Sequence, residues 1–214
     1  MITIALPKGR LGEDAERILL ETGIMKIPVD RDSRRLIFDV AEGVRVLLVR
    51  AWDVPTYVEI GTADVGICGK DDLMEQGTDV LELVDLGFGG CTMAVATVKT
   101  LSREELFGRG FLRVATKYPN IARRFFDGLS LQTEILKLYG SVELAAVTGL
   151  SDCIVDIVST GATLRENGLH VVEHIFDSTA RWIVNRRSFY MQYEVLSSWT
   201  EKIKKYPRRR YHDF

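Results

Sequence analysis

The residues best suited to chemistry lie in one short stretch, where an apolar strand delivers a carboxylate into a turn of small residues. Asp156 belongs to the strand, and Gly161 stands among hydroxyl side chains in the turn. A glycine lets the backbone approach an anion closely, and successive N–H groups with a following helix N-terminus attract phosphate. The residues expected to grip a phosphate are Ser159, Thr160, Gly161, Ala162 and Thr163.

Asp156 has a different predicted role from the turn. A carboxylate directly before a phosphate-binding turn is placed to accept hydrogen bonds from the hydroxyls of a ribose whose 5′-phosphate sits in the turn. The alternative is that residues 159–163 form only a strand-to-helix turn with an N-cap threonine, because short Gly/Thr loops are common. Spacing alone leaves both interpretations open.

Basic side chains follow two other predicted strands. Lys8 and Arg10 come after one apolar strand, and Arg50 directly follows another. Cations at the carboxyl ends of strands suit a pyrophosphate-binding edge of an open α/β sheet, where Arg50 could clamp a phosphate and Asp53 could orient it. The alternatives are a solvated basic turn around Lys8 and a buried Arg50–Asp53 pair that fixes the loop.

The remaining candidates for nucleotide or pyrophosphate binding are less specific. Arg34 belongs to an arginine cluster at residues 31–35, and charge clusters are usually solvated. Lys117 follows a further strand and could meet a phosphate, whereas Tyr118 could stack on adenine or simply pack. Gly69 ends another strand, where the dipole of the next helix would face it.

Cysteine and histidine patterns predict neither a metal site nor a covalent nucleophile. Cys68, Cys91 and Cys153 lie in separate apolar runs without CxxC spacing, which favours reduced thiols in a cytoplasmic protein. The histidines have no acid or serine partner at informative spacing; they are His170, His174 and His212. We therefore expect no dedicated metal cage and no covalent catalysis.

Composition narrows the class of protein. The chain has 214 residues, of which 46% are hydrophobic and 27% charged, and its formal net charge is -2. This balance is typical of a soluble globular protein and gives no overall attraction for nucleic acid. No apolar stretch approaches the roughly 20 residues that span a bilayer, and Pro7 interrupts the apolar start well before a signal-peptide core is formed. We expect a cytoplasmic protein without nucleic-acid or membrane partners.

Strands alternate with helices along the chain, which predicts an α/β protein with mainly parallel sheets and flanking helices. Three glycines within residues 87–90 mark a hinge or crossover. Ser102 and Glu105 predict a capping box at the start of a short helix. A single C-terminal helix is predicted by an apolar stripe of Phe189, Leu196, Trp199 and Ile203.

Four segments together resemble the ATP phosphoribosyltransferase family. The longest, residues 143–164, begins with Glu143 and matches the characteristic motif of the family through Asp156 and the turn. The others cover residues 6–11, 50–58 and 115–120. The similarity extends over nearly the whole chain and is far more specific than a phosphate-binding loop alone.

The resemblance implies an activity and a fold. Members of the family transfer 5-phosphoribosyl from 5-phosphoribosyl-1-pyrophosphate (PRPP) to N1 of the adenine of ATP and release pyrophosphate, which opens histidine biosynthesis. Mg²⁺ is expected to be carried mainly by phosphate oxygens and water. The implied fold has two lobes resembling type II periplasmic binding proteins, with residues 1–88 plus 178–214 as lobe I and residues 89–177 as lobe II carrying the PRPP loop.

The resemblance also assigns roles to residues. Lys8 and Arg50 become the catalytic candidates. The PRPP-binding candidates are Glu143, Asp156, Ser159, Thr160, Gly161, Ala162 and Thr163. The weaker nucleotide or pyrophosphate candidates are Arg10, Arg34, Asp53, Gly69, Lys117 and Tyr118. Glu143 could join Asp156 on the ribose hydroxyls or cap the helix that it opens.

The chain length and two local differences refine the resemblance. An end at Phe214 leaves no room for the C-terminal regulatory domain of long-form members, so the chain resembles the short form. That form works with a regulatory subunit similar to histidyl-tRNA synthetase, and the implied assembly is a hetero-octamer containing homodimers of the catalytic chain. Thr92 and the pair Arg186–Arg187 depart from the usual family residues, but neither belongs to the predicted phosphate loop.

Two other functions fit parts of the pattern. A non-catalytic small-molecule-binding module could share the two-lobed fold, although no secretion signal is present and an acid with hydroxyls suits ribose phosphate better than a generic solute. Another PRPP transferase with a different acceptor would share the phosphate loop. The whole-chain resemblance favours ATP as the acceptor.

Overall fold

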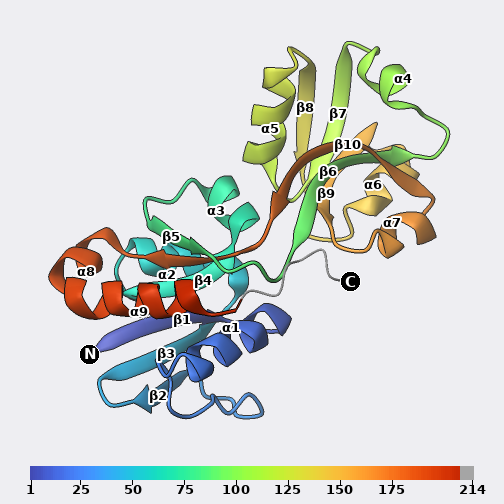
Figure 1. Cartoon of the computed structure of the whole chain (residues 1–214). Helices are drawn as coiled ribbons and strands as arrows, with labels where there is room; N and C mark the ends of the chain where they lie inside the picture. The colour runs from blue at the N-terminus through green and yellow to red at the C-terminus, as the bar shows by residue number, and fades with distance from the viewer. Residues whose placement is uncertain (208–214) are drawn as a thin grey trace. The chain divides into compact units, whose positions relative to one another are not determined.

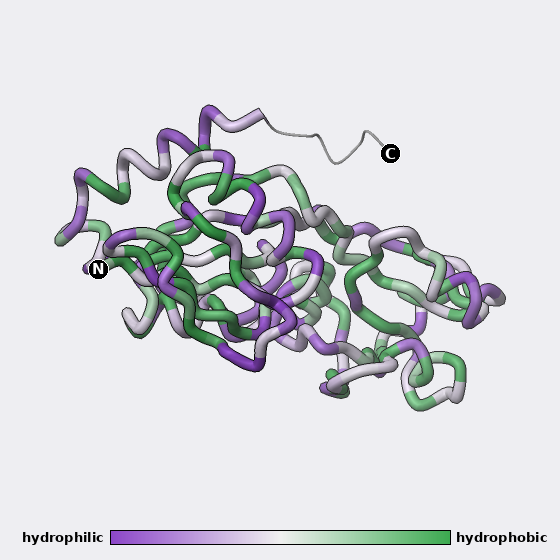
Figure 2. The backbone as a smooth tube through the Cα atoms, turned by 90° about the horizontal axis from the view of Figure 1, so that it is seen from below, coloured by the Kyte–Doolittle hydropathy of each residue, from purple (hydrophilic) through white to green (hydrophobic). Residues whose placement is uncertain are grey.

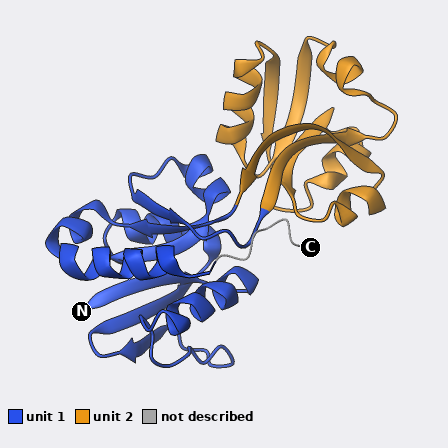
Figure 3. Cartoon of the chain, in the orientation of Figure 1, with its two compact units in different colours: residues 1–90, 179–214 blue, residues 91–178 orange. Residues whose placement is uncertain are grey.

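The computed structural model describes residues 1–207 and divides into two compact units. Unit 1 comprises Met1–Gly90 together with the chain from Thr179 onward, and unit 2 comprises Cys91–Ser178 (Figure 3). The chain therefore leaves unit 1 directly after the glycine-rich residues 87–90 and returns at Thr179. His212 lies outside the described residues.

Unit 1 contains a six-stranded sheet in the order β2-β3-β1-β4-β11-β5. Its strands are β1 (Ile2–Pro7), β2 (Ile37–Ala41), β3 (Val44–Val49), β4 (Val65–Gly69), β5 (Leu81–Asp85) and β11 (Ala180–Val184). β1 pairs in parallel with β3 and β4, whereas β2, β11 and β5 join antiparallel. The centre of β1 is fully buried at Ile4, Ala5 and Leu6, as expected for a strand flanked on both sides.

Helices cover the sheet of unit 1 (Figure 1). They are α1 (Arg10–Glu21), α2 (Val54–Glu59), α3 (Lys70–Gln76), α8 (Arg186–Met191) and α9 (Tyr193–Lys205), with a 3₁₀ turn η1 (Ala51–Asp53). The prediction of one C-terminal helix is wrong, because the chain breaks at Gln192, where φ is -127° and ψ is 36°. Asp64 fixes this break, since its Oδ1 accepts hydrogen bonds from Ser188 Oγ and Gln192 Nε2.

Unit 2 contains a five-stranded sheet in the order β10-β6-β9-β7-β8. Its elements are β6 (Cys91–Val98), α4 (Arg103–Phe107), β7 (Phe111–Thr116), α5 (Pro119–Gly128), β8 (Gln132–Lys137), α6 (Glu143–Val147), β9 (Cys153–Val158), α7 (Ala162–Glu166) and β10 (Leu169–Ser178). The capping box predicted from Ser102 and Glu105 is confirmed, with both reciprocal hydrogen bonds present at the start of α4.

The sheets are mixed, and the expectation of mainly parallel sheets is wrong. Of the nine strand pairs among the described residues, four are parallel: β1 with β3 and β4, and β7 with β8 and β9. A tight turn makes β2 and β3 an antiparallel hairpin. β11 returns from unit 2 and enters unit 1 antiparallel to both β4 and β5. The α/β class itself is confirmed.

The apolar segments form the interior of each unit. In the trace of Figure 2, hydrophobic stretches alternate with hydrophilic ones along the chain. The core of unit 1 includes Trp182, which is completely buried and donates its indole N–H to the hydroxyl of Thr200 on α9. None of the helices within residues 1–207 combines the length and apolar character that a membrane crossing needs.

Candidate functional site

The carboxyl ends of β7, β8 and β9 form one edge of the sheet in unit 2, because the three strands run parallel. Thr116 pairs with Val155. The next residues of the two strands, Lys117 and Asp156, are therefore at the same level at this edge. Glu143 opens α6 after the carboxyl end of β8. The fold therefore gathers these three candidates at the edge that precedes the 159–163 turn, where α/β sheets commonly bind ligands.

The turn after β9 is closed by a left-handed glycine. Gly161 has φ 69° and ψ 6° directly before α7, a backbone conformation that residues with a Cβ seldom adopt. The N–H of Ala162 donates to Thr160 Oγ1 at 3.4 Å. Ser159, Thr160 and Thr163 are exposed, so their hydroxyls face solvent and can reach a ligand.

Arg165 is a cation at the turn that sequence reasoning missed. Its Nη1 donates to the carbonyl of Thr160 at 3.0 Å, and it lies 3.0 Å from the position that a Cβ on Gly161 would occupy. The available signal was its spacing, four residues after the glycine and therefore one helical turn away. The guanidinium adds positive charge beside the turn.

The two acids at this edge are both half-buried. Asp156 lies opposite Ala94 of β6, and its Oδ1 accepts the N–H of Ile157 at 2.8 Å, which orients the carboxylate. Glu143 is an acid in the first turn of α6, where the N-cap residue Val142 makes no side-chain cap. A first-turn carboxylate suits the helix dipole.

In unit 1 the carboxyl ends of β3, β1 and β4 form a second edge. Pro7 pairs with Val49, and the N–H of Lys8 donates to the carbonyl of Val49 at 2.9 Å. Lys8 and Arg50 are therefore brought together as the first residues beyond two adjacent strands. Both side chains are exposed, and neither has a side-chain partner within residues 1–207.

Arg50 and Asp53 do not form the buried pair considered as an alternative. Arg50 is exposed, and no ion pair joins it to Asp53 in the described part of the chain. Their contact is between backbone groups, with the N–H of Asp53 donating to the carbonyl of Arg50 at 2.9 Å. The guanidinium is thus available to an anion.

Two glycines position the turn that carries Lys8. Gly9 has φ 77° and ψ -165°, a region essentially restricted to glycine. A Cβ on Gly12 would lie 1.7 Å from the carbonyl oxygen of Pro7, so only glycine allows α1 to start so close above the end of β1. Sequence reasoning missed Gly12, which carries no signal beyond its residue type.

A pocket of about 240 Å³ lies beside this turn, within unit 1. Its lining residues are Lys8, Gly9, Glu13, Arg31, Ser33, Arg35, Leu36 and Leu48. Arg34, the candidate taken from the arginine cluster, is exposed and is not among them. The pocket therefore has three cations in its lining: Lys8, which the sequence singled out, and Arg31 and Arg35, which belong to the predicted arginine cluster but were not chosen from it.

The other candidates occupy varied positions. Arg10 is exposed at the start of α1. Gly69 is packed under the carboxylate of Asp71, since a Cβ there would lie 2.3 Å from Asp71 Oδ1. Tyr118 is only 2% exposed, which favours packing over stacking on a base. Lys117 lies with its ammonium 5.7 Å from the centre of that ring.

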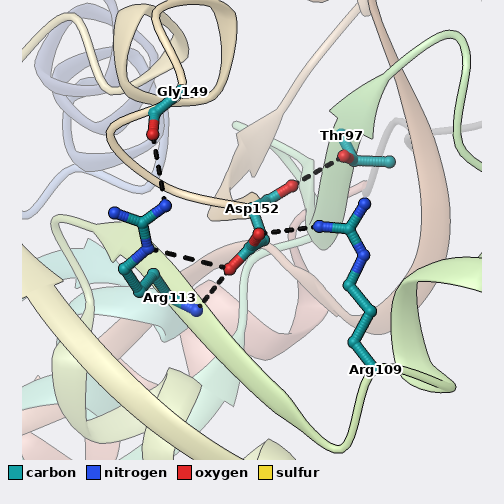
Figure 4. A network of polar contacts seen from close by, with 5 residues as sticks. All are labelled: Thr97, Arg109, Arg113, Gly149 and Asp152. Carbon is teal, nitrogen blue, oxygen red and sulfur yellow. Dashed lines mark hydrogen bonds and ion pairs between the residues drawn. The ribbon is translucent and has the colours of Figure 1, made fainter.

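Part of the long motif is structural and lies at the opposite edge of the sheet in unit 2 (Figure 4). The carboxylate of Asp152 accepts Arg109 Nη1 and the backbone N–H of Arg113, each at 2.8 Å. The guanidinium of Arg113 also reaches the carbonyl of Gly149, at 3.3 Å. Thr97 Oγ1 donates to the carbonyl of Asp152 at 2.8 Å. These contacts join the amino ends of β7 and β9 and take no part in the ligand edge.

The buried thiols are poor nucleophiles. Burial, with the Asp152 carboxylate adding to the effect, raises the pKa of the Cys153 thiol to about 12. Burial and the nearby carboxylates of Asp72, Asp71 and Glu82 raise the pKa of Cys68 well above its ordinary value. Since the thiolate is the reactive form, neither group suits covalent catalysis at neutral pH.

Comparison with known proteins gives consistent matches. The family described as ATP phosphoribosyltransferase matches residues 50–205. An ATP phosphoribosyltransferase of Moorella thermoacetica is 50% identical over 213 residues, which cover 96% of this chain and 92% of the relative. A second, from Caldanaerobacter subterraneus subsp. tengcongensis, is 51% identical over 189 residues, covering 88% and 89% of the two chains.

Solved structures agree with these matches. A chain of the ATP phosphoribosyl transferase (HisG:HisZ) complex from Thermotoga maritima has a TM-score of 0.82 at 36% identity, covering 96% of this chain and 98% of that one. The periplasmic aliphatic sulphonate binding protein SsuA from Escherichia coli has a TM-score of 0.56 at 13% identity, covering 94% and 68%. The second likeness concerns the fold alone, and it confirms the predicted resemblance to periplasmic binding proteins.

Proposed function

The chain belongs to the ATP phosphoribosyltransferase family, and from this premise we propose which of its residues serve each part of the reaction. The activity is transfer of 5-phosphoribosyl from PRPP to N1 of the adenine of ATP, with release of pyrophosphate, as the first step of histidine biosynthesis. The observation that carries the residue assignment is the alignment of Asp156 and Lys117 at the strand edge before the Gly161 turn.

Unit 2 is proposed to hold the ribose 5-phosphate part of PRPP. The backbone of the 159–163 turn and the exposed hydroxyls of Thr160 and Thr163 would bind the 5′-phosphate. Asp156 would accept hydrogen bonds from the ribose hydroxyls, with Glu143 as the second acid. Lys117 at the same edge adds a positive charge for a phosphate.

Unit 1 is proposed to hold pyrophosphate groups through Lys8 and Arg50. As the bond from C1 of ribose to the pyrophosphate oxygen breaks, its electron pair leaves with the pyrophosphate and positive charge develops on the sugar. Two exposed cations without side-chain partners within residues 1–207 can neutralise the leaving group without first breaking other ion pairs there. Arg10, Arg34, Asp53 and Gly69 are assigned supporting roles at this edge.

The acceptor requires no deprotonation before attack, because adenine N1 carries a lone pair. The chain's contribution is therefore to orient two polyanions and to stabilise departing charge. Mg²⁺ is proposed to be bound mostly by phosphate oxygens and water. Residues 1–207 contain no group of three or more His, Cys, Asp or Glu side chains suited to a metal ion, and this mode of binding needs none.

The proposed assembly is inferred from the chain's membership of the family. We infer that the chain forms homodimers within a hetero-octamer that includes a regulatory subunit similar to histidyl-tRNA synthetase, as a short-form member. The solved HisG:HisZ complex from Thermotoga maritima supports a hetero-oligomer. The cytoplasm is the proposed location, in keeping with three free cysteines.

A turnover assay tests this function directly. The purified chain, alone and with its co-expressed regulatory subunit, is mixed with PRPP, Mg²⁺ and a series of adenine and guanine nucleotides, and pyrophosphate release is measured. We expect release with ATP and formation of N1-phosphoribosyl-ATP. Binding of both substrates without release would indicate a binding module, and release only with another acceptor would indicate a different transferase.

A further inference from the structure

A buried carboxylate on α1 holds an arginine that reaches the pocket of unit 1. Glu16 is 7% exposed, and its Oε2 accepts Arg31 Nε at 2.9 Å and Nη2 at 2.7 Å. Its Oε1 accepts the N–H of Val29 at 2.7 Å, and Val29 is itself in the hydrophobic core. Glu16 thus fixes both the backbone and the side chain of the segment that enters the arginine cluster.

The geometry leaves one nitrogen of Arg31 unused by the protein. Nε and Nη2 are taken by Glu16, whereas Nη1 has no hydrogen-bond partner among the described residues. The guanidinium lies above the first turn of α1, where Nη2 is 3.3 Å from the position of a Cβ on Gly12. A side chain at residue 12 would crowd it, so the glycine leaves space for this placement.

The surroundings of Arg31 select an anion. Lys8 and Arg35 line the same pocket, and Glu13 is the one carboxylate among its lining residues. The pocket also lies at the amino end of the twelve-residue helix α1, whose partial positive charge favours phosphate. Three cations in about 240 Å³ suit a polyphosphate better than a single carboxylate or a sugar.

We propose that Arg31 is an additional phosphate-binding residue and that Glu16 is its positioning residue. Glu16 holds two nitrogens of the guanidinium, so that the third is presented with Lys8 and Arg35 to a pyrophosphate group. This chemistry is shared by PRPP and by the polyphosphate tail of ATP. The inference depends on the proposed function only for the identity of that substrate, and not for pyrophosphate binding itself.

A purely structural role for the pair makes a different prediction. If Glu16 and Arg31 only anchor the loop, their variants lower stability, and any loss of affinity follows unfolding. If Arg31 binds phosphate, Arg31→Gln lowers the affinity for pyrophosphate even at temperatures where the variant is fully folded, although it also loses stability because the buried Glu16 carboxylate keeps only the N–H of Val29. Glu16 then matters for binding only while Arg31 is present.

The test is a calorimetric titration of the full chain with inorganic pyrophosphate in the presence of Mg²⁺. The variants are Arg31→Gln, Glu16→Gln and the double variant, with Arg17→Gln as the matched control. Arg17 is on the same helix and pairs with Asp14, but it does not line the pocket. Loss of a charge-assisted hydrogen bond should weaken pyrophosphate binding by about tenfold or more in the Arg31 and Glu16 variants.

The double variant tests whether Glu16 acts through Arg31, and steady-state kinetics show which substrate Arg31 binds. The double variant should bind pyrophosphate no more weakly than Arg31→Gln alone, because Glu16 acts through Arg31. In turnover, KM should rise for ATP or for PRPP with kcat nearly unchanged, and the affected substrate identifies the source of the bound group. Arg31→Lys should restore part of the affinity.

Three results would overturn the inference. The first is normal pyrophosphate affinity in Arg31→Gln. The second is a double variant in which Glu16→Gln weakens pyrophosphate binding as much as it does in the wild type. The third is a loss of pyrophosphate affinity in Arg31→Gln that is no larger than the loss in Arg17→Gln. If Glu16→Gln fails to fold, Arg31→Gln and Arg31→Lys still decide whether Arg31 binds pyrophosphate. Absence of turnover in the wild type would contradict the proposed function, while the titration would still test Arg31.

Discussion

The hydroxyl of Thr116 connects the carboxyl ends of two neighbouring strands, because it donates to the carbonyl of Val155 at 2.6 Å. The same oxygen accepts the N–H of Tyr118 at 2.8 Å, and Thr116 is completely buried. Lys117 stands between these two contacts. One threonine therefore helps to fix both the register of β7 against β9 and the direction in which the chain leaves β7 toward α5.

Replacing Thr116 by valine should damage both stability and donor binding. The variant leaves a buried carbonyl and a buried N–H without this partner, which costs about 1–3 kcal/mol of unfolding free energy. We also expect weaker PRPP binding, because Lys117 and Asp156 lose their common support. Urea unfolding measures the first effect and titration with PRPP measures the second.

Thr97→Val is the matched control for that experiment. Thr97 is equally buried and donates to the carbonyl of Asp152 at the opposite edge of the same sheet. It should lose similar stability but keep its affinity for PRPP. Equal losses of affinity in the two valine variants would show that Thr116 acts only through overall stability.

The glycine of the phosphate turn gives a second prediction. Gly161→Ala places a Cβ in a left-handed conformation and 3.0 Å from Arg165 Nη1. The backbone strain costs about 1–2 kcal/mol, and the turn must shift or Arg165 must move. We expect PRPP affinity to fall at least tenfold, and Thr160→Ala to weaken it without unfolding the protein.

Gly168→Ala is the matched control, because it should introduce the same backbone strain as Gly161→Ala without changing the phosphate turn. Gly168 has φ 73°, close to the 69° of Gly161, and a Cβ there would meet nothing within 4 Å. Its alanine variant should show the same loss of stability with unchanged PRPP affinity. If affinity falls equally in both, or in neither, the 159–163 turn does not bind the phosphate.

A third prediction concerns the two exposed cations of unit 1. Lys8→Ala and Arg50→Ala should each lower kcat by about a hundredfold or more, as removal of a group that stabilises developing charge does. Both variants should melt normally, because neither side chain has a side-chain partner within residues 1–207. The control is Lys26→Ala, an exposed lysine of the same unit. A normal kcat in both site variants would exclude them from catalysis.

Local patterns predicted the elements that carry the candidate residues. The strand with Asp156 and the strand before Lys8 are recognised from apolar runs that end at glycine or proline within a few residues, and the structure has both. The edges follow from parallel pairing of such strands. A reader of the sequence can therefore place Lys8, Arg50, Lys117 and Asp156 at strand ends.

Long-range contacts determined what the sequence did not reveal. Ala180 pairs with Gly69, and no local pattern indicates that a returning strand inserts there antiparallel. The break at Gln192 depends on Asp64, 128 residues earlier. Arg31 rather than Arg34 lines the pocket because Glu16, fifteen residues before it, holds its guanidinium.

The fourth prediction uses the buried thiol of Cys153, whose folded pKa is raised to about 12 from an ordinary 9.0. Below pH 9 the thiol is protonated in both states and does not affect the pH dependence. Above it, only the unfolded chain releases the proton, so stability falls as pH rises toward the folded pKa. In urea unfolding between pH 8 and pH 10.5, Cys153→Ala should show a shallower decline than the wild type, by up to about 1.4 kcal/mol per pH unit. Cys91 is only partly buried, so Cys91→Ala serves as the control and should retain most of the slope. Identical slopes in the wild type and Cys153→Ala would show that this thiol ionises equally in both states.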